Sequence, residues 1–460
     1  MFRLWMATVE RAPTAIAVIE GSSGRKWTRA GLAAAAARWA DALPRRGGRC
    51  ALAGQRVAMS LPNGAEWFQV FIGLMAVGAV PVPIDPSEPD LAQAAAARSL
   101  RASGIWREGR LHLLSPPSHA RRLPKDECLV KLTSGSSGEP KGLSATHNQM
   151  EADGRQICAA MGILPGDSNL AAIPLGYSYG LGNLVVPLIL QGSRVICLSG
   201  ILPHAIAAEA QRFRPTVFPA VPPILKALAG SGIPRRALAS VRLVISAGSR
   251  LAPEIARSFA DTFGIRVHGF YGTSETGGIS FDASGDATFE GRSVGPPMGG
   301  VRIAFRPGGR FSVAGPAVLG EGRFSPPDRA VMNGLGELVL LGRTDRVVKL
   351  AGRRVQLAEI EAALRSIQGV RDAFAHVGGG VDSPLCAAVA TELASSEVRR
   401  LLRSRLAPWK IPSRIAALRE FPASARGKTD ARRLRQILSA PLTVASISTF
   451  SSGRQISAPR

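Results

Sequence analysis

The chain contains the stretch Leu132-Thr133-Ser134-Gly135-Ser136-Ser137-Gly138-Glu139-Pro140-Lys141-Gly142, in which four hydroxyl side chains and three glycines precede or surround one lysine. Glycines let a backbone approach a ligand closely and adopt positive φ. Successive N–H groups in such a loop form a concave nest for anions, to which hydroxyls and an ammonium add donors. The stretch therefore predicts a polyphosphate site. It is not a standard P-loop, because Lys141 is followed by Gly142 rather than Ser or Thr.

A flexible Ser/Gly linker is the alternative interpretation of this stretch. The ordered Pro140-Lys141-Gly142 ending and the apolar lead-in Leu129-Val130-Lys131-Leu132 favour a strand followed by a ligand-binding loop.

Size and composition indicate a folded protein of several packed units. The chain has 460 residues, of which 46% are hydrophobic and 20% are charged. Its five cysteines form no CxxC pair, which argues against a disulfide framework or a zinc site and indicates a reducing compartment, the cytoplasm. No signal peptide is apparent. The longest apolar run, Trp67–Ile84, is interrupted by glycines and prolines, so we expect a buried helix and a strand rather than a membrane span.

The net charge of +24 predicts an affinity for polyanions, such as nucleotides, coenzyme A or an acidic carrier protein. We expect no nucleic-acid partner, because no nucleic-acid-binding motif appears and aromatic residues are only 5% of the chain.

Strand-like and helix-like segments alternate, which is typical of a parallel sheet covered by helices. Examples in the first part are a helix over 30–43, a strand over 57–61 and a helix over 65–77. Residues 87–127 look less regular, with Pro116-Pro117 and clustered arginines, and we expect them to run over the surface. After the glycine-rich loop, the segment Arg242–Ser249 reads as an apolar strand that ends in small residues, which puts a backbone edge at the C-terminal end of a sheet, where α/β folds bind ligands.

A second chemically informative stretch is Phe270-Tyr271-Gly272-Thr273-Ser274-Glu275-Thr276. A tyrosine can stack on a purine, a hydroxyl can hold a phosphate oxygen, and a carboxylate can hold Mg²⁺ beside it. A single glutamate is usually only a surface charge. The prediction that Glu275 binds Mg²⁺ therefore depends on the presence of the other motifs.

Together these motifs resemble those of the adenylate-forming (AMP-binding) superfamily, which includes acyl-CoA synthetases and peptide-synthetase adenylation domains. The resemblance covers roughly residues 10–436. Further matching segments are Ile173–Leu181, Ser293–Pro297, Glu337–Arg346 and Phe421–Asp430. Four positions depart from the usual pattern: Ser137 and Ser274 replace threonines, Tyr177 replaces a histidine, and Pro326-Pro327-Asp328 replaces a Thr-Gly-Asp triplet.

The resemblance implies a role for each matching residue. Catalytic roles would fall to Lys428, Glu275 and Ser274, with Glu275 as the Mg²⁺ ligand. Tyr177 and Gly272 would line the acid pocket, and Asp345 would be the hinge of the small domain. The residues expected to bind ATP are Thr133, Ser134, Gly135, Ser136, Ser137, Gly138, Lys141, Gly248, Ser249, Tyr271, Asp328 and Arg343. For Arg353 and Arg354, a solvated basic strand is the simplest interpretation, although relatives pass the pantetheine arm near Gly352.

The implied fold is α/β, with a large N-terminal layered α/β region (residues 1–344), a small mobile α+β C-terminal domain (345–438) and a flexible tail (439–460). The implied activity is ATP-dependent activation of a fatty or aryl carboxylic acid, with transfer to the thiol of coenzyme A. Two alternatives stay open: loading of the phosphopantetheine of an acyl carrier protein, and a degenerate member without catalysis.

Overall fold

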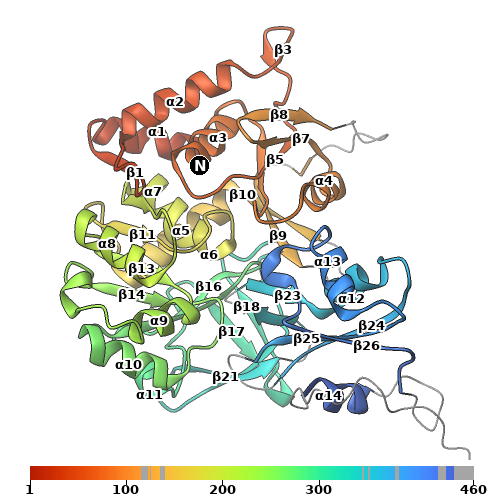
Figure 1. The fold of residues 1–460 in the computed structure, drawn as a ribbon. Helices are drawn as coiled ribbons and strands as arrows, with labels where there is room; N and C mark the ends of the chain where they lie inside the picture. Colours follow the sequence, from red (N-terminus) through yellow and green to blue (C-terminus); the bar gives the residue numbers. More distant parts are fainter. Residues whose placement is uncertain are drawn as a thin grey trace, which may run out of the picture.

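A computed structural model describes residues 1–114, 123–124, 126–134, 140–343, 347–350, 353–378, 383–422 and 431–439. Its largest element is an eight-stranded sheet with strand order β16-β15-β14-β13-β11-β12-β1-β2 (Figure 1). The pairs from β15 through to β1 are parallel, whereas the edge strands β16 and β2 are antiparallel to their neighbours. The strand bounds are β1 Ile16–Glu20, β2 Lys26–Thr28, β11 Ser168–Ala171, β12 Arg194–Cys197, β13 Val217–Ala220, β14 Leu243–Ser246, β15 Val267–Thr273 and β16 Gly277–Phe281.

Helices cover both faces of this sheet, as the alternating pattern predicts. One face packs Phe218 and Val244 against α8 (Pro203–Phe213), α9 (Pro222–Ala229) and α10 (Pro253–Phe263). The opposite face packs Val217 and Ile245 against α5 (His147–Met161). Because successive strand residues point to opposite faces, adjacent residues such as Val217 and Phe218 serve two separate cores. Helices α1 (Phe2–Arg11) and α7 (Val186–Gln191) extend the second layer.

A four-stranded sheet, with order β6-β5-β7-β8, lies beside the large one. Its strands are β5 Arg56–Met59, β6 Val80–Pro83, β7 Ala102–Arg107 and β8 Arg110–Leu113, and its helices are α2 Arg29–Asp41, α3 Ala65–Ala76 and α4 Asp90–Ser99. A short hairpin of β3 (Arg45–Arg46) and β4 (Arg49–Cys50) projects from it. The apolar run Trp67–Ile84 is thus mostly α3 and β6. No helix in the described part of the chain is both long and apolar enough to cross a bilayer.

The expectation that residues 87–127 form an irregular surface segment is wrong. They contain α4, β7, β8 and the start of β9, and Ala102 and Ile105 of β7 are buried against the neighbouring strand β5. Two of the segment's arginines, Arg107 and Arg110, lie at the facing ends of β7 and β8. Arg107 pairs with Asp90 at 2.7 Å.

Smaller sheets complete the large region. The hairpin of β9 (Glu127–Ser134) and β10 (Pro140–Thr146) stands alone, β17 (Arg302–Phe305), β18 (Phe311–Ala314) and β19 (Arg323–Phe324) form a three-stranded sheet, and β20 (Asp328–Met332) pairs with β21 (Leu338–Arg343). Short helices are α6 (Ser178–Gly180), the π-helix Leu181–Val185 and α11 (Asp286–Glu290), together with 3-10 turns over Arg235–Leu238, Pro307–Gly309 and Pro408–Lys410.

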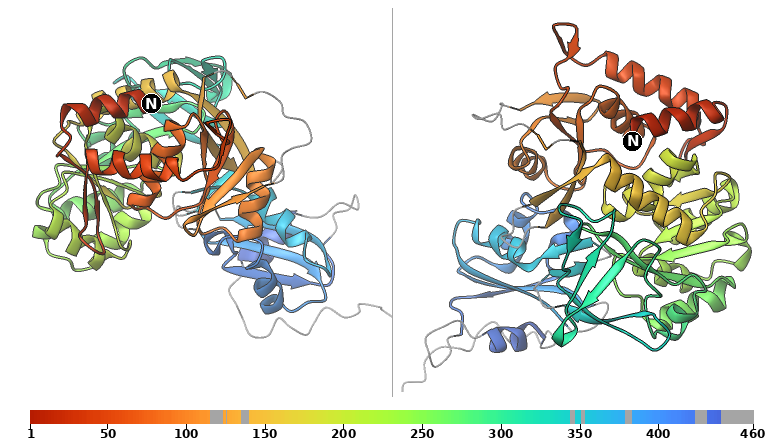
Figure 2. Two further views of the ribbon diagram at one scale, coloured as in Figure 1. Left: turned by 90° about the horizontal axis from the view of Figure 1, so that it is seen from above. Right: turned by 180° about the vertical axis from the view of Figure 1, so that it is seen from behind.

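The C-terminal part is a small α+β domain that lies at one side of the large region (Figure 2). The pair β22 (Val347–Leu350) and β23 (Arg353–Gln356) precedes a three-stranded sheet of β24 (Val370–Val377), β25 (Leu385–Thr391) and β26 (Arg414–Leu418). Helices α12 (Leu357–Arg365) and α13 (Ser395–Leu402) pack on one face of that sheet through Ala387 and Val389, whereas α14 (Ala431–Ser439) packs on the other through Cys386 and Ala388. The predicted tail, residues 439–460, falls outside the described residues except for Ser439.

Candidate active site

A cavity of 1410 Å³ lies where the large region meets the small domain. It is lined by residues from the ends of β13, β14 and β15, from the segment between β6 and α4, and from β9 of the β9–β10 hairpin. The small domain contributes Arg353, Trp409 and Lys410. The cavity opens at the C-terminal ends of parallel strands, the place where ligands bind in α/β sheets.

The polar part of the cavity brings together two residues that were predicted to bind a nucleotide, Tyr271 and Asp328. The hydroxyl of Tyr271 donates to Oδ2 of Asp328 at 3.0 Å, and both residues are buried and line the cavity. Asp328 begins β20 and pairs directly with Arg343 at the end of β21. The aspartate therefore occupies a definite position in a ladder despite its altered neighbours, although the Arg343 side chain is outside the described part.

Two glycine positions in this wall depend on having no side chain. Gly248 lies at φ +87° after β14 and, with Ser249, borders the cavity. A Cβ on Gly272 would lie 2.5 Å from the carbonyl oxygen of Gly277, so only glycine fits between β15 and β16. With glycine at both positions, the backbone can lie close to the cavity. A ligand could then contact its main-chain groups directly.

Ser274 and Glu275 follow at the turn between β15 and β16. The hydroxyl of Ser178 donates to Oγ of Ser274 at 2.8 Å, which ties this turn to α6. Glu275 is half-buried, and its carbonyl oxygen accepts from the Leu319 amide at 2.8 Å. The single carboxylate of Glu275 would suit Mg²⁺, because this ion is usually held by one or two carboxylates together with the substrate's phosphates.

The predicted phosphate loop is the turn of an antiparallel hairpin. Thr133 pairs with Lys141, and Ser134 pairs with Pro140. Thr133 is half-buried and lines the cavity, whereas Lys141 is exposed. Gly135, Ser136, Ser137 and Gly138 lie outside the described residues, and so does the side chain of Ser134. Their assignment to the phosphates stays a prediction.

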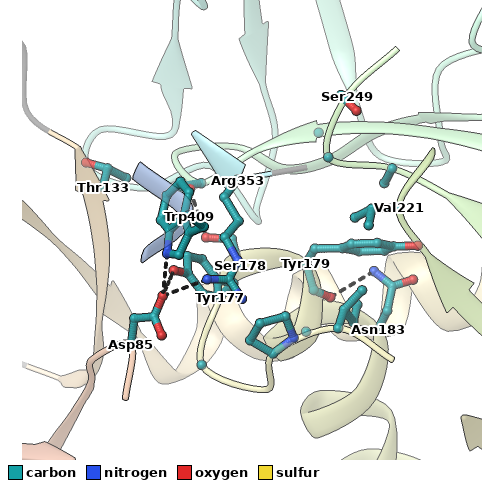
Figure 3. Close-up of a pocket in the computed structure, with 18 of the residues that line it drawn as sticks. Asp85, Thr133, Tyr177, Ser178, Tyr179, Asn183, Val221, Ser249, Arg353 and Trp409 are labelled. Atoms are coloured by element: carbon teal, nitrogen blue, oxygen red, sulfur yellow. Dashed lines mark hydrogen bonds and ion pairs between the residues drawn. The ribbon is translucent and has the colours of Figure 1, made fainter. Parts of the chain in front are cut away.

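The opposite part of the cavity is apolar and rigid. Tyr179 and Phe270 face one another with ring centroids 6.1 Å apart. The Tyr179 hydroxyl donates to the Ile245 carbonyl at 3.0 Å, which fixes its ring against the end of β14. Tyr179 is followed by the π-helix, a form often found at functional sites. Asn183 in this π-helix donates to the Tyr179 carbonyl at 3.3 Å (Figure 3).

Two buried charges that the sequence analysis did not single out also line the cavity. Lys131 on β9 and Asp153 on α5 are each 3% exposed. The Gly278 amide donates to Oδ1 of Asp153 at 2.9 Å. Burial raises the pKa of the Asp153 carboxyl, and the Lys131 ammonium opposes this rise only in part. The alternation of β9 could have revealed Lys131, because it shares a strand face with Thr133.

Tyr177, the predicted pocket residue, has an unforeseen partner. Its hydroxyl donates to Oδ2 of Asp85 at 2.6 Å. Arg353 and Trp409 of the small domain donate to the same oxygen, at 3.0 and 3.3 Å (Figure 3). Arg353 is therefore paired at the cavity, and the simple interpretation of it as a solvated strand residue is wrong.

Lys428 and Asp345 lie outside the described residues. The described flanks of Lys428, however, are informative. Phe421 and Leu434 pack on the face of the small sheet that carries α14, which is opposite to the face that carries α12. Glu359 of α12 lines the cavity, and β23 contacts β9.

Comparison with known proteins identifies the family. The model of the AMP-binding enzyme family matches residues 5–107 and 106–306, which is more than half of the chain. The chain belongs to the AMP-binding enzyme family. The AMP-binding, adenylate-forming fold predicted from the motifs is thereby confirmed.

Individual AMP-binding enzymes resemble the chain over different shares of their length. Phenyloxazoline synthase MbtB from Mycolicibacterium paratuberculosis is 30% identical across 93% of the chain, which spans 41% of MbtB. Benzoate–CoA ligase from Thauera aromatica is 28% identical across 68% of the chain and 66% of the ligase. The chain thus spans less than two thirds of these two relatives.

Among solved structures, a double mutant of o-succinylbenzoate CoA synthetase (MenE) from Bacillus subtilis superposes with a TM-score of 0.81. The match covers 94% of the chain and 98% of MenE, at 20% identity. At this identity the likeness supports the fold alone.

Proposed function

We propose that this AMP-binding enzyme activates an aryl carboxylic acid with ATP and transfers the acyl group to the thiol of coenzyme A. One observation carries the proposal. A single cavity is lined at one part by Thr133, Gly248, Tyr271 and Asp328, and at another by the apolar rings of Tyr179 and Phe270. An acid lying on the rings can therefore present its carboxylate to the α-phosphate of a nucleotide held by the polar residues.

The chemistry has two balanced steps. A carboxylate oxygen attacks the α-phosphorus of ATP, the bond to the β-phosphate oxygen breaks, and pyrophosphate leaves. The thiol sulfur then attacks the acyl carbon, the bond to the AMP oxygen breaks, and the thiol proton is lost. The protein's contribution is to position the reactants and to neutralise charge.

In this scheme the hairpin of Thr133 and Lys141 holds the β- and γ-phosphates, and Asp328 accepts hydrogen bonds from the ribose hydroxyls. Lys428 lies between the carboxylate and the α-phosphate, where its charge offsets the negative charge that develops. Mg²⁺, which would be held by Glu275, supplies further charge neutralisation at the phosphates.

The position of the small domain fits the second step better than the first. Phe421 and Leu434, which flank Lys428 in the sequence, pack on the face of the small sheet that is opposite to α12. Strand β23, in contrast, contacts β9. Delivery of Lys428 to the cavity therefore requires the small domain to rotate. We assign the hinge to Asp345, which lies in the connection between β21 and β22.

An aryl acid suits the apolar part of the cavity better than a long flexible chain. The Tyr179 hydroxyl is bonded to the Ile245 carbonyl and its ring lies beside that of Phe270, so this wall is aromatic and held in place. Flat aromatic surfaces favour offset or edge-to-face contact with another ring. The benzoate–CoA ligase relative is consistent with this choice.

A carrier-bound phosphopantetheine is the second candidate acceptor, because a net charge of +24 favours an acidic protein as well as the phosphates of coenzyme A. AMP formation should be measured with one benzoate-type acid and either coenzyme A or a phosphopantetheinylated carrier. We expect faster AMP formation with coenzyme A. A response to the carrier alone would favour the second candidate, and no ATP binding would favour a member without catalysis.

A further inference from the structure

Two acidic residues in the segment between β6 and α4, Asp85 and Glu88, form side-chain contacts with the small domain. Oδ2 of Asp85 accepts hydrogen bonds from Tyr177, Arg353 and Trp409, and the Asp85 side chain is only 9% exposed. Tyr177 belongs to the large region, whereas the other two donors belong to the small domain. One carboxylate oxygen thus joins the wall of the acid pocket to the small domain.

Glu88 forms a second contact with the small domain, at the 3-10 turn Pro408–Lys410. It pairs with the Lys410 ammonium and also accepts from the Ala407 amide at 3.1 Å. Lys410 lies between Glu88 and Glu359 of its own domain, at 2.7 Å from the latter. Burial alone would lower the pKa of Lys410, but the two carboxylates raise it above its ordinary value. The ammonium therefore stays charged between two carboxylates.

The Arg353 guanidinium lies over aromatic rings from both domains. Its guanidinium carbon lies 5.4 Å from the ring centroid of Tyr177 and 5.0 Å from that of Trp409 (Figure 3). Both distances are within the range of cation–π attraction. The guanidinium therefore depends on groups from both domains for its position.

We propose that Asp85 and Glu88 form a latch that holds the small domain in this orientation and orders Tyr177 at the acid pocket at the same time. This inference rests on the proposed function, in which this orientation serves thiol transfer. Asp85 and Glu88 are positioning residues, because they act through Tyr177, Arg353 and Lys410 and not on the reacting atoms.

The chemistry of the latch suits a contact that must break and re-form. Its charged groups can be solvated by water when the domains separate, whereas an apolar interface of similar size would resist separation. When the small domain leaves, Asp85 loses the donors from Arg353 and Trp409, and the Tyr177 ring loses the Arg353 guanidinium. The order of the pocket wall is therefore linked to the position of the small domain.

The test uses the full chain with Asp85→Asn or Glu88→Gln, and Glu392→Gln as a matched control. Glu392 forms exposed ion pairs within the small domain, with Arg371 and Arg419, so its loss should leave the latch intact. Hydrogen exchange followed by mass spectrometry reports on the latch without any activity, because the Ala407 amide donates to Glu88.

In peptides that contain Ala407, we expect hydrogen exchange to be faster than in wild type for both latch variants. For the control Glu392→Gln, we expect the exchange rate to equal that of wild type. In half-reaction assays, acyl transfer from preformed adenylate should fall by about tenfold in the latch variants, with adenylate formation unchanged or faster. Unchanged exchange at Ala407, or an equal loss of both half-reactions, would overturn the latch. If the latch variants exchange faster at Ala407 but the wild-type protein consumes no ATP, the latch stands and the proposed function is refuted. Failure of the latch and failure of the proposed function therefore give different results.

Discussion

The Tyr271 hydroxyl and the Asp328 carboxylate are joined by a buried hydrogen bond of 3.0 Å. This bond places the aspartate of the altered Pro326-Pro327-Asp328 segment beside the tyrosine of the second motif. The two prolines therefore changed the local sequence without moving the carboxylate away from the cavity.

Replacing Asp328 should weaken nucleotide binding. Asp328→Asn removes the charge that would accept bonds from the ribose, and hydrogen bonds to charged groups contribute about 1.5–3 kcal/mol. We expect ATP affinity, measured by calorimetry, to fall by about tenfold or more. Tyr271→Phe, which keeps the ring and removes the hydroxyl that donates to Asp328, should have a smaller effect. Equal effects of the two substitutions would argue against a direct contact of Asp328 with the nucleotide.

Lys428→Ala should separate the two half-reactions. Acid-dependent pyrophosphate release should fall sharply because the developing charge loses its cation, whereas transfer from preformed adenylate should be largely retained. The two rates are measured separately with ATP plus acid and with synthetic adenylate plus coenzyme A. Equal loss of both would undo the assignment of Lys428.

Gly272→Ala should destabilise the protein. The new Cβ would approach the Gly277 carbonyl oxygen to 2.5 Å, so the backbone between β15 and β16 must move. Overpacking of this kind costs about 1–3 kcal/mol. Thermal unfolding should show a lowered midpoint. Gly299→Ala is the matched control, since a Cβ there meets nothing within 4 Å. An unaltered midpoint for Gly272→Ala would contradict the packing described.

Asp85 should make stability depend on pH in acid. Burial alone would raise its pKa, but hydrogen bonds from Tyr177 and Ser87 and the charge of Arg353 lower it below the ordinary 3.8. A carboxyl with a depressed pKa stabilises the fold above its unfolded pKa and loses this contribution as the pH falls through the folded value. The difference in unfolding free energy between wild type and Asp85→Asn should therefore shrink below about pH 4. A difference that is constant with pH would contradict the ionised role of Asp85.

Alkylation should be confined to Cys50. Burial raises the pKa of Cys128 and of Cys158 to about 12 and raises that of Cys197 further, and Cys386 is also buried. Thiols rather than thiolates are then present near neutral pH, and thiols react slowly. Mass spectrometry after brief treatment with iodoacetamide should show one modification, on half-buried Cys50. Rapid labelling of Cys158 in the native protein would show that its helix opens readily.

The sequence was most informative where a structural feature depends on a short, continuous stretch of residues. The strand that leads into the glycine-rich stretch and the helix at Leu357–Arg365 could be predicted because their patterns depend on near neighbours in the chain. Asp85 could not, because its role depends on Arg353 and Trp409, which are 268 and 324 positions away. Asp153 was missed for the same reason, since only the packing of α5 against the β9–β10 hairpin brings it to the cavity.

The most direct test of the proposed function is acid-dependent release of pyrophosphate from ATP, measured over a panel of aryl and fatty carboxylic acids with purified full-length protein. The account predicts release with at least one aryl acid, AMP formation in equal amount when coenzyme A is added, and little release from Lys428→Ala. A protein that binds ATP but releases no pyrophosphate with any acid, with or without a thiol, would contradict it.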